Sequence, residues 1–486
     1  MFDFLKKKIK KEEFPIYVYN TLTRKKELFK PVKAGNLSFY QCGPTVYWTQ
    51  HIGNMRAMVM ADLIDRTFQY FGYSVTFVRN YTDVGHLTGD NLGDADKGED
   101  RMEIASKREH LSPKQISDKY IKIFENDVKE LNTLSPNYKP RATETIKEII
   151  EMVDIMLKKG FAYSTDLAIY FDVSKAKDYT KLSRQNLEEN ISGAGSADIE
   201  DPNKKNPVDF AVWFFKAGVH KNALQYWKSP FKSPLVKDGE GFPGWHIECS
   251  AMIRKLLGKT IDIHMGGIEH IPVHHTNEIA QSEAVNGVPL ADYWVHNEWL
   301  VTNNSKMAKS EGTSFSLSEL KEKGFDPLAF RFFLMQAHYR SRQNFTWDAL
   351  KAAQNGYIHL TNIIRSLGNK KGTINNNFKK LFSEKIADDF NIPQGLAVLF
   401  EMLKSDISKE DKLATAIDFD RVLGLKLEEV KQEKTDAPEE IKKLINEREE
   451  ARKSKNWVKS DELRSKLKDL GYELKDSTNG VEVKKI

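Results

Sequence analysis

Between residues 37 and 79 the chain alternates strand, helix and strand, and this pattern constrains the fold more than any other feature. Residues 37–42 alternate in polarity and carry aromatic side chains, as strands do, and Gly43-Pro44 ends them. Helical periodicity runs from about residue 56 to residue 70, and residues 74–79 are a second predicted strand. Strands joined by a helix pair in parallel, and such sheets bind ligands at the carboxyl ends of their strands. The sequence therefore predicts an α/β fold with a parallel sheet.

The same α/β pattern returns after Gly244. Residues 260–264 form a predicted buried strand, and Gly266 and Gly267 would let the backbone approach a ligand closely. A helix is expected from Pro272 to about residue 284, and a further strand over residues 293–300. Residues 161–224 carry short strand-like pieces and a polar loop, so we interpret them as an insertion between two halves of one fold.

Helices dominate the remaining parts of the chain. Residues 112–157 are expected to be mainly helical, with Ser112 as an N-cap and Pro113 in the first turn. Residues 327–423 are also mainly helical, and the apolar-poor residues 426–437 resemble a linker. A small terminal unit should follow, with one helix starting at Pro438 and a second starting from an N-cap at Ser460.

Length and composition define the class of protein. A chain of 486 residues is too long for one core and suggests two to four domains. No stretch approaches the ~20 apolar residues that span a bilayer, so no membrane partner is expected. The N-terminus lacks an apolar signal-peptide core, and two cysteines do not make a disulfide scaffold, so we expect a cytoplasmic protein. The net charge of +5 neither requires nor excludes nucleic acid.

Both cysteines belong to a set of side chains that suits zinc. His274 and Glu278 lie on one face of the predicted helix because they are four residues apart. Cys42 ends the first strand, and Cys249 lies just before the strand that leads to this helix. Thiolate, imidazole and carboxylate are zinc ligands. Adjacent helical residues point about 100° apart, so only one histidine can face the metal with Glu278; spacing favours His274 over His275. Lone cysteines, however, are usually small buried hydrophobic residues.

Two short motifs could hold a nucleotide. His51-Ile-Gly-Asn54 falls at the predicted strand-to-helix junction, where a histidine and helix N-terminal N–H groups could face a phosphate. Gly53 would let an adenine ring lie close to the backbone. Lys306 and Lys309 lie three residues apart on a polar loop and could clamp a polyphosphate. Neither motif is decisive alone, because a short lysine pair usually lies on a solvated surface.

In this order and setting, the motifs resemble cysteinyl-tRNA synthetase, a class I aminoacyl-tRNA synthetase, over nearly the whole chain. The segments that carry the resemblance are Cys42-Gly-Pro-Thr-Val-Tyr47, His51-Ile-Gly-Asn54, Gly244-Trp-His-Ile-Glu-Cys249, His274-His275-Thr-Asn-Glu278 and Lys306-Met-Ala-Lys-Ser310. Two positions depart from the family pattern. Asn54 stands where the motif often ends in a second histidine, and Ala308 stands where serine is common.

The resemblance implies a reaction and a role for each motif. Family members activate L-cysteine with ATP to cysteinyl-adenylate and then transfer cysteine to tRNA(Cys). One zinc ion per chain would bind the substrate thiolate, Mg²⁺ would accompany ATP, and a monomer is expected. The implied zinc ligands are Cys42, Cys249, His274 and Glu278. The implied catalytic residues are His51, Asn54, Lys306 and Lys309. ATP would be bound by Pro44, His51, Gly53, Asn54, Gly266, Gly267 and Lys309, and the amino acid by Thr82 and Trp245.

The resemblance also implies a domain organisation. A class I Rossmann-like catalytic domain is split by an insertion and followed by an α-helical domain and a small C-terminal unit. The expected parts are a first catalytic half (14–145), a connective insertion (146–225), a second catalytic half (226–300), a lysine-loop and stem-contact region (301–357), a helical bundle (358–425) and a C-terminal anticodon-binding unit (438–486). In the last unit, Trp457 would be either a stacking surface for bases or a core residue.

Two alternative functions, a small-amine ligase and an RNA-binding protein, fit the sequence less well. A cysteine ligase of the same fold, of the mycothiol-pathway type, joins cysteine to a small amine and shares the zinc and nucleotide motifs. The long helical region and the terminal unit favour tRNA over a small amine. A non-catalytic, zinc-stabilised RNA-binding protein would have no need of both nucleotide motifs.

Overall fold

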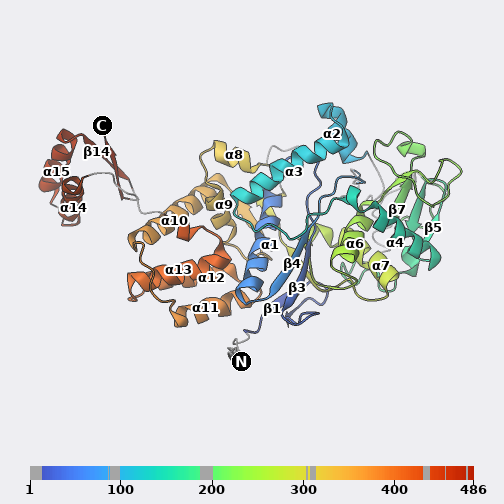
Figure 1. Cartoon of the computed structure of the whole chain (residues 1–486), viewed down its shortest axis with the longest axis horizontal. Coiled ribbons are helices and arrows are strands. Elements are labelled where there is room, and N and C mark those ends of the chain that lie inside the picture. The colour runs from blue at the N-terminus through green and yellow to red at the C-terminus, as the bar shows by residue number, and fades with distance from the viewer. Residues whose placement is uncertain are drawn as a thin grey trace, which may run out of the picture.

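The structure is a computed structural model of the chain (Figure 1). It describes residues 14–85, 87, 99–185, 201–302, 305–306, 314–430, 438–454, 456–477 and 480–485. Among these residues, no helix combines the length and the hydrophobicity that crossing a membrane requires.

A four-stranded parallel sheet forms the centre of the molecule and confirms the predicted fold class. It comprises β3 (Asn36–Gln41), β4 (Ser74–Arg79), β9 (Ile261–Gly267) and β10 (Ala291–Asn297), in the order β10-β9-β3-β4. Each strand overlaps a predicted one. The predicted strand over 293–300 was too long, however, because the chain leaves this sheet after Asn297 and Leu300 begins a strand of another sheet.

Helix α1 (Ile52–Tyr70) connects β3 to β4 and is the expected crossover helix. It begins four residues before the predicted start at residue 56, and His51 is its N-cap. The difference arises because Gly53 and Asn54, which are poor helix formers, hide the periodicity of a first turn whose Ile52 and Met55 are buried. The helix therefore presents the His51 motif directly at the carboxyl ends of the strands.

A second sheet forms the insertion between β4 and β9, to the right of the central sheet in Figure 1. Its antiparallel strands are β5 (Ala162–Ser164), β6 (Ala168–Phe171), β7 (Phe210–Phe215) and β8 (Gly241–Pro243). Helices α4 (Ile146–Lys158), α6 (Trp245–Leu256) and α7 (His274–Asn286) share a hydrophobic core with this sheet, whereas α2 (Arg101–Glu109) and α3 (Pro113–Glu130) belong to the core around α1. Ser112 caps α3 in a capping box with Gln115, as predicted. Helix α7 starts at His274, two residues after the predicted start at Pro272.

The remaining elements of the main body are a short hairpin, a small sheet and a helical region. A hairpin of β1 (Tyr17–Asn20) and β2 (Lys25–Leu28) precedes the sheet, and β11 (Leu300–Thr302), β12 (Ser305–Lys306) and β13 (Gln343–Phe345) form a small sheet after it. The helical region contains α8 (Leu317–Glu322), α9 (Pro327–Leu334), α10 (Trp347–Ser366), α11 (Asn376–Ala387), α12 (Ile392–Lys404) and α13 (Lys409–Leu423). One continuous hydrophobic core joins α1 to these helices. The buried ion pair of Arg331 with Asp62, 2.6 Å long, crosses the same boundary.

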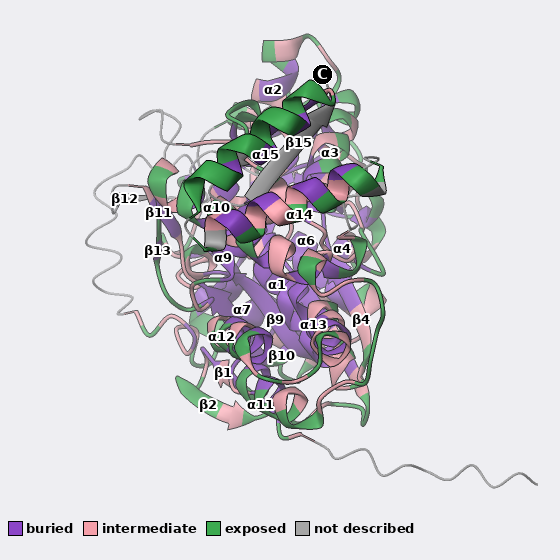
Figure 2. Ribbon diagram, turned by 90° about the vertical axis from the view of Figure 1, so that its left-hand side faces the viewer, coloured by how far each residue is buried: buried purple, intermediate pink, exposed green. Residues whose placement is uncertain are grey.

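The C-terminal unit has its own small core and lies apart from the main body in Figure 1. It contains α14 (Glu439–Lys453), α15 (Trp457–Asp469) and a hairpin of β14 (Tyr472–Ser477) and β15 (Gly480–Lys485). The prediction that Ser460 caps the second helix was wrong. Asn456 is the N-cap, and Ser460 is buried inside α15. Figure 2 shows α15 as mainly exposed, whereas buried, intermediate and exposed residues alternate along α14.

Candidate active site

A cavity of about 300 Å³ opens at the carboxyl ends of β3, β9 and β10, where parallel sheets bind their ligands. Residues of the predicted nucleotide motifs and of the predicted zinc and substrate site meet in this cavity. From the nucleotide motifs, Pro44, His51, Gly53, Asn54, Gly266 and Gly267 line this cavity. From the zinc and substrate predictions, Cys42, Thr82, Trp245, Cys249 and His274 line it as well. Glu278 lies behind them and is fully buried.

The four predicted zinc ligands lie together on three different elements. Their ligand atoms are all within 4.8 Å of one another. Cys249 Sγ lies 3.6 Å from His274 Nε2, and Cys42 Sγ lies 3.7 Å from Glu278 Oε1. A tetrahedral zinc ion brings thiolate and nitrogen ligands to about 3.3–3.8 Å from each other. These residues therefore fit a zinc ion in both chemistry and spacing.

The two neighbouring histidines of α7 point in different directions, as their helical spacing predicts. His274 Nε2 lies 2.9 Å from Glu278 Oε1. His275 Nε2 instead approaches Cys42 Sγ at 3.4 Å, and its Nδ1 lies 2.7 Å from His296. A second group of possible ligands, Cys42, His264, His275 and Glu278, is equally compact. Cys42 and Glu278 thus belong to both arrangements, and His274 accompanies Cys249 in the first.

Four further histidines surround the cluster, three of them buried (His246, His264 and His296), and the sequence reasoning missed all four. His246 Nδ1 lies 2.9 Å from His274 Nδ1, and His264 Nε2 lies 2.9 Å from Glu278 Oε2. His270 packs against His274 and His275, and His296 contacts His275. Outer contacts of this kind orient metal ligands. One signal was available, because six of the twelve histidines of the chain fall between residues 246 and 296.

Neighbouring charges set the protonation states of the cluster. Burial opposes a charged imidazole, but Glu278 and Cys249 outweigh it and raise the pKa of His274 to about 10. Burial also opposes ionisation of Glu278, yet His264 and His274 hold its pKa well below the usual range. A hydrogen bond with Cys42 lowers the pKa of Cys249 to about 6, whereas burial raises the pKa of Cys42. The cluster therefore presents anionic sulfur and oxygen, which a divalent cation would neutralise.

On the nucleotide side of the cavity, the first turn of α1 faces the glycines that end β9. As the N-cap of α1, His51 lies at the positive end of the helix dipole. Asn54 donates its side-chain N–H to Gln50. A Cβ at Gly266 would lie 2.6 Å from His270 Nδ1 and from a ring carbon of His275. Glycine is therefore needed there for the histidine packing as well as for the close ligand approach that the sequence predicts.

The two predicted amino-acid contacts, Thr82 and Trp245, both line the cavity. Trp245 stacks on His274, with ring centroids 4.2 Å apart. Thr82 accepts a hydrogen bond from the side chain of Asn80, and its backbone pairs with Pro44 and Val46. The lining residues that were not predicted include Glu269, whose carboxylate accepts a hydrogen bond from Trp299 Nε1 at 2.8 Å, and Trp299 itself.

The predicted lysines are only partly described. The backbone of Lys306 lies on β12, which pairs with β11 beside the cavity residue Leu300. Lys309 and Ala308 lie outside the described residues.

Comparisons with known proteins agree with this architecture. The family described as "tRNA synthetases class I (C) catalytic domain" matches residues 28–355. The DALR domain matches residues 381–425, and the "Cysteinyl-tRNA ligase anticodon binding domain" matches residues 434–483. Together these matches extend from the hairpin before the sheet to the C-terminal unit.

Two curated relatives match over nearly their full length. Cysteine--tRNA ligase 1 of Burkholderia lata is 40% identical over 467 residues, which are 96% of this chain and 96% of the relative. Cysteine--tRNA ligase of Treponema denticola is 41% identical over 503 residues, with 96% of this chain and 99% of the relative covered.

Solved structures with a similar fold include two of methionyl-tRNA synthetase from Mycobacterium tuberculosis with methionyl-adenylate. Their TM-scores are 0.50 and 0.52 at 11% and 13% identity, and each comparison covers 80% of this chain and 90% of the other. At such low identity the likeness concerns the fold alone.

Proposed function

The chain belongs to the cysteinyl-tRNA synthetases, and on this premise we propose that ATP and cysteine meet in the cavity at the carboxyl ends of β3, β9 and β10. The enzyme is an ATP-dependent cysteine--tRNA ligase. The observation that carries the proposal is that zinc-type ligands and the His51 motif border one cavity, with Cys42 and Thr82 beside Gly53 and Gly266.

Adenylate formation requires positioned charge more than it requires a general base. The carboxylate of cysteine is already ionised at neutral pH and attacks the α-phosphate of ATP directly, releasing pyrophosphate. His51, at the positive end of α1, would donate to phosphate oxygens as negative charge develops there. Asn54, in the first turn of the same helix, would assist His51 in binding ATP. Gly53, Pro44, Gly266 and Gly267 would lie along the nucleotide. Lys306 and Lys309 would neutralise the departing pyrophosphate together with Mg²⁺.

Selection of cysteine would take place at the Cys42–Cys249–His274–Glu278 cluster. A bound zinc ion would offer the substrate a soft cation that prefers a thiolate to a serine hydroxyl. Trp245, already stacked on His274, would cover the side chain of the amino acid, and Thr82, which also lines the cavity, would help to hold it. A purely steric pocket would be a poor substitute, since differences of one small group give only about 10–200-fold discrimination.

Transfer to tRNA involves the parts beyond the sheet. We propose that residues 301–357 contact the tRNA stem, that residues 358–425 form the helical bundle, and that residues 438–486 bind the anticodon of tRNA(Cys). The catalytic domain would comprise residues 14–145 and 226–300 around the insertion at 146–225. We further propose a monomeric enzyme in the cytoplasm. The match of residues 434–483 to an anticodon-binding family supports tRNA as the acceptor. This match does not support the alternative that the chain is a ligase acting on a small amine.

Pyrophosphate exchange and metal analysis test this proposal together. The purified protein should contain about one zinc ion per chain. It should also exchange pyrophosphate into ATP with cysteine and much more weakly with serine. Exchange without zinc dependence would contradict the role of the cluster. A protein that forms the adenylate but does not charge tRNA(Cys) would instead support the small-amine alternative.

A further inference from the structure

A fully buried arginine in the first half of α1 binds three backbone carbonyls from other parts of the chain. Arg56 Nη1 donates to Trp299 O at 2.6 Å. Its Nη2 donates to Ser341 O at 2.6 Å and to His338 O at 3.2 Å. Arg56 is 0% exposed. Charge-assisted bonds of this kind are stronger than neutral ones, and the planar guanidinium fixes their directions.

The carbonyls that Arg56 binds lie at the start of the small sheet beside the cavity. Trp299 immediately precedes β11, and Ser341 precedes β13, which pairs with β11 in parallel. The N–H of Gln343 also donates to Trp299 O, at 3.2 Å. Strand β12, on which Lys306 lies, is the other neighbour of β11. Arg56 therefore ties the start of this sheet to α1, the helix that His51 caps.

The start of α1 makes a second set of contacts, with the segment that follows β11 and β12. The N–H of Ile52 donates to Phe315 O at 2.7 Å, and His51 forms an isolated β-bridge with Ser316. Arg56 binds the chain at Trp299, which precedes β11 and β12. Residues 51–52 bind the chain at residues 315–316, which follow these two strands. Both contacts originate within six residues of one helix.

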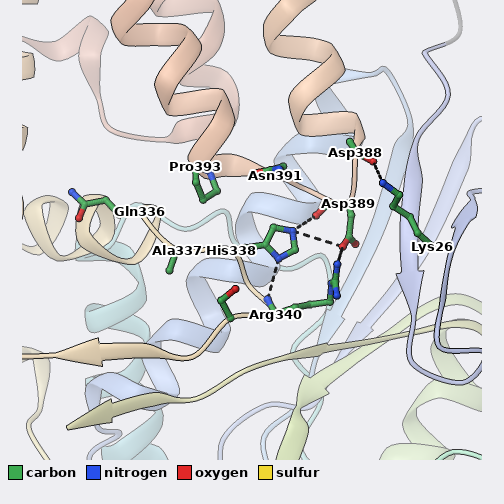
Figure 3. Close-up of a pocket in the computed structure, with 10 residues that line it drawn as sticks. Lys26, Gln336, Ala337, His338, Arg340, Asp388, Asp389, Asn391 and Pro393 are labelled. Atoms are coloured by element: carbon green, nitrogen blue, oxygen red, sulfur yellow. Dashed lines mark hydrogen bonds and ion pairs between the residues drawn. The ribbon is translucent and has the colours of Figure 1, made fainter. Parts of the chain in front are cut away.

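The loop that Arg56 binds at His338 and Ser341 is held from its outer side by the helical region. Figure 3 shows His338 and Arg340 directed at Asp389, in the connection between α11 and α12. His338 Nε2 lies 2.8 Å from Asp389 O, and Arg340 Nε donates to Asp389 Oδ2 at 2.8 Å. The carboxylate also accepts from Tyr339 at 2.6 Å and from the N–H of Tyr19 at 2.9 Å. The loop is thus clamped between Arg56 inside and Asp389 outside.

We propose that Arg56 is a positioning residue for adenylate formation, which keeps the Trp299–Leu300 wall of the cavity and strand β12 in register with His51. Burial lowers the pKa of Arg56 to about 10, so the guanidinium is still charged at neutral pH. Lysine keeps the charge but has a single nitrogen, which cannot reach carbonyls on both sides of the fork. The inference depends on the proposed ATP site, because it assigns a function to the wall of that site.

The test compares Arg56→Lys with Arg331→Lys in the full-length zinc enzyme. Arg331 is the matched control, since its guanidinium is also fully buried and also binds backbone carbonyls, those of Leu423 and Leu131, but it lies away from the cavity. Both variants should lower the thermal midpoint. Only Arg56→Lys should reduce kcat/KM for ATP in pyrophosphate exchange, by about 10- to 100-fold. The KM for cysteine and the zinc content should change less than about 3-fold in either variant.

A second variant covers the case in which Arg56→Lys does not fold. Arg340→Gln removes the outer clamp at a side chain that is 39% exposed, and it should also reduce kcat/KM for ATP, by a smaller factor than Arg56→Lys does. If the soluble Arg56 and Arg340 variants differ from wild type only in thermal midpoint, as Arg331→Lys does, the positioning role is overturned. Absence of exchange in the wild-type enzyme would instead refute the proposed ATP site.

Discussion

Cys42 Sγ and Glu278 Oε1 lie 3.7 Å apart although 236 positions separate them in the sequence. Cys42 directly follows strand β3 and Glu278 belongs to α7, so the parallel sheet and its crossover connections bring them together. The contact lies at the wall of the cavity that also contains the His51 motif. A metal centre built here would touch the substrate, whereas a structural zinc site could lie anywhere in the fold.

Replacing one thiol should separate cysteine recognition from ATP binding. Cys249→Ser keeps the size of the side chain but removes the soft ligand, so zinc content should fall below about one tenth of wild type. The KM for cysteine should rise by about 100-fold or more, with a much smaller change in the KM for ATP. Metal analysis and pyrophosphate exchange measure both effects. A zinc-free variant with an unchanged KM for cysteine would show that the metal does not bind the substrate.

If zinc is held by Cys42, Cys249, His274 and Glu278, the outer histidines should tune its affinity without supplying ligands. His264 lies 2.9 Å from Glu278 Oε2, so His264→Gln should weaken zinc binding by about 10- to 100-fold. Competition with a chromophoric chelator measures this loss. His110→Gln is the control, because His110 is exposed at the end of α2, and it should bind zinc as wild type does. Equal affinities in both variants would leave His264 with a packing role alone.

A buried carboxyl on α3 should make stability depend on pH. Burial, with a smaller contribution from Glu130, raises the pKa of Asp127 to about 7, so the folded state keeps a proton that the unfolded chain releases near pH 4. The folded state therefore binds more protons in this range, and stability falls as pH rises from about 4 to 7. Asp127→Asn should thus be more stable than wild type by about 1–3 kcal/mol at pH 8 and by less at pH 5.

Thermal or denaturant unfolding at the two pH values measures this difference. The control is Asp118→Asn on the same helix, where hydrogen bonds from Lys114 and Arg141 lower the pKa of the carboxyl. That variant should gain nothing at pH 8, because its carboxylate is stabilised by folding. A pH-independent effect of Asp127→Asn would contradict the buried proton.

Replacing an exposed aromatic residue in the C-terminal unit should weaken the use of tRNA without affecting adenylate formation. Trp457 is 58% exposed, so the alternative that it is a core residue was wrong. Stacking of one base on an aromatic ring contributes about 1–3 kcal/mol. We therefore expect Trp457→Ala to lower kcat/KM for tRNA(Cys) by about 5- to 100-fold in aminoacylation and to leave pyrophosphate exchange unchanged. Val458→Ala, at a neighbour that is 73% exposed, should change neither. An effect of Trp457→Ala on exchange would point to a folding defect.

Element boundaries were predicted less well than element types, for local reasons. The first turn of α1 was missed because Gly53 and Asn54 interrupt its apolar pattern, although tertiary contacts bury Ile52 and Met55. Ser460 was taken for a helix cap because serine favours that position, but Asn456 fills it. The hairpin of β14 and β15 was not predicted.

The sequence by itself determined the parallel α/β fold and the chemistry of the site. Periodicity reports which segments alternate between strand and helix, and motifs such as His51-Ile-Gly-Asn54 carry their residue types and spacing within one local segment. Only the tertiary structure decided which distant groups meet. It brought Cys42 to Cys249 and His274, enclosed them in four more histidines, and linked Arg56 to Trp299 and Ser341. Such contacts depend on packing between strands and helices far apart in the chain, and no local pattern encodes that distance.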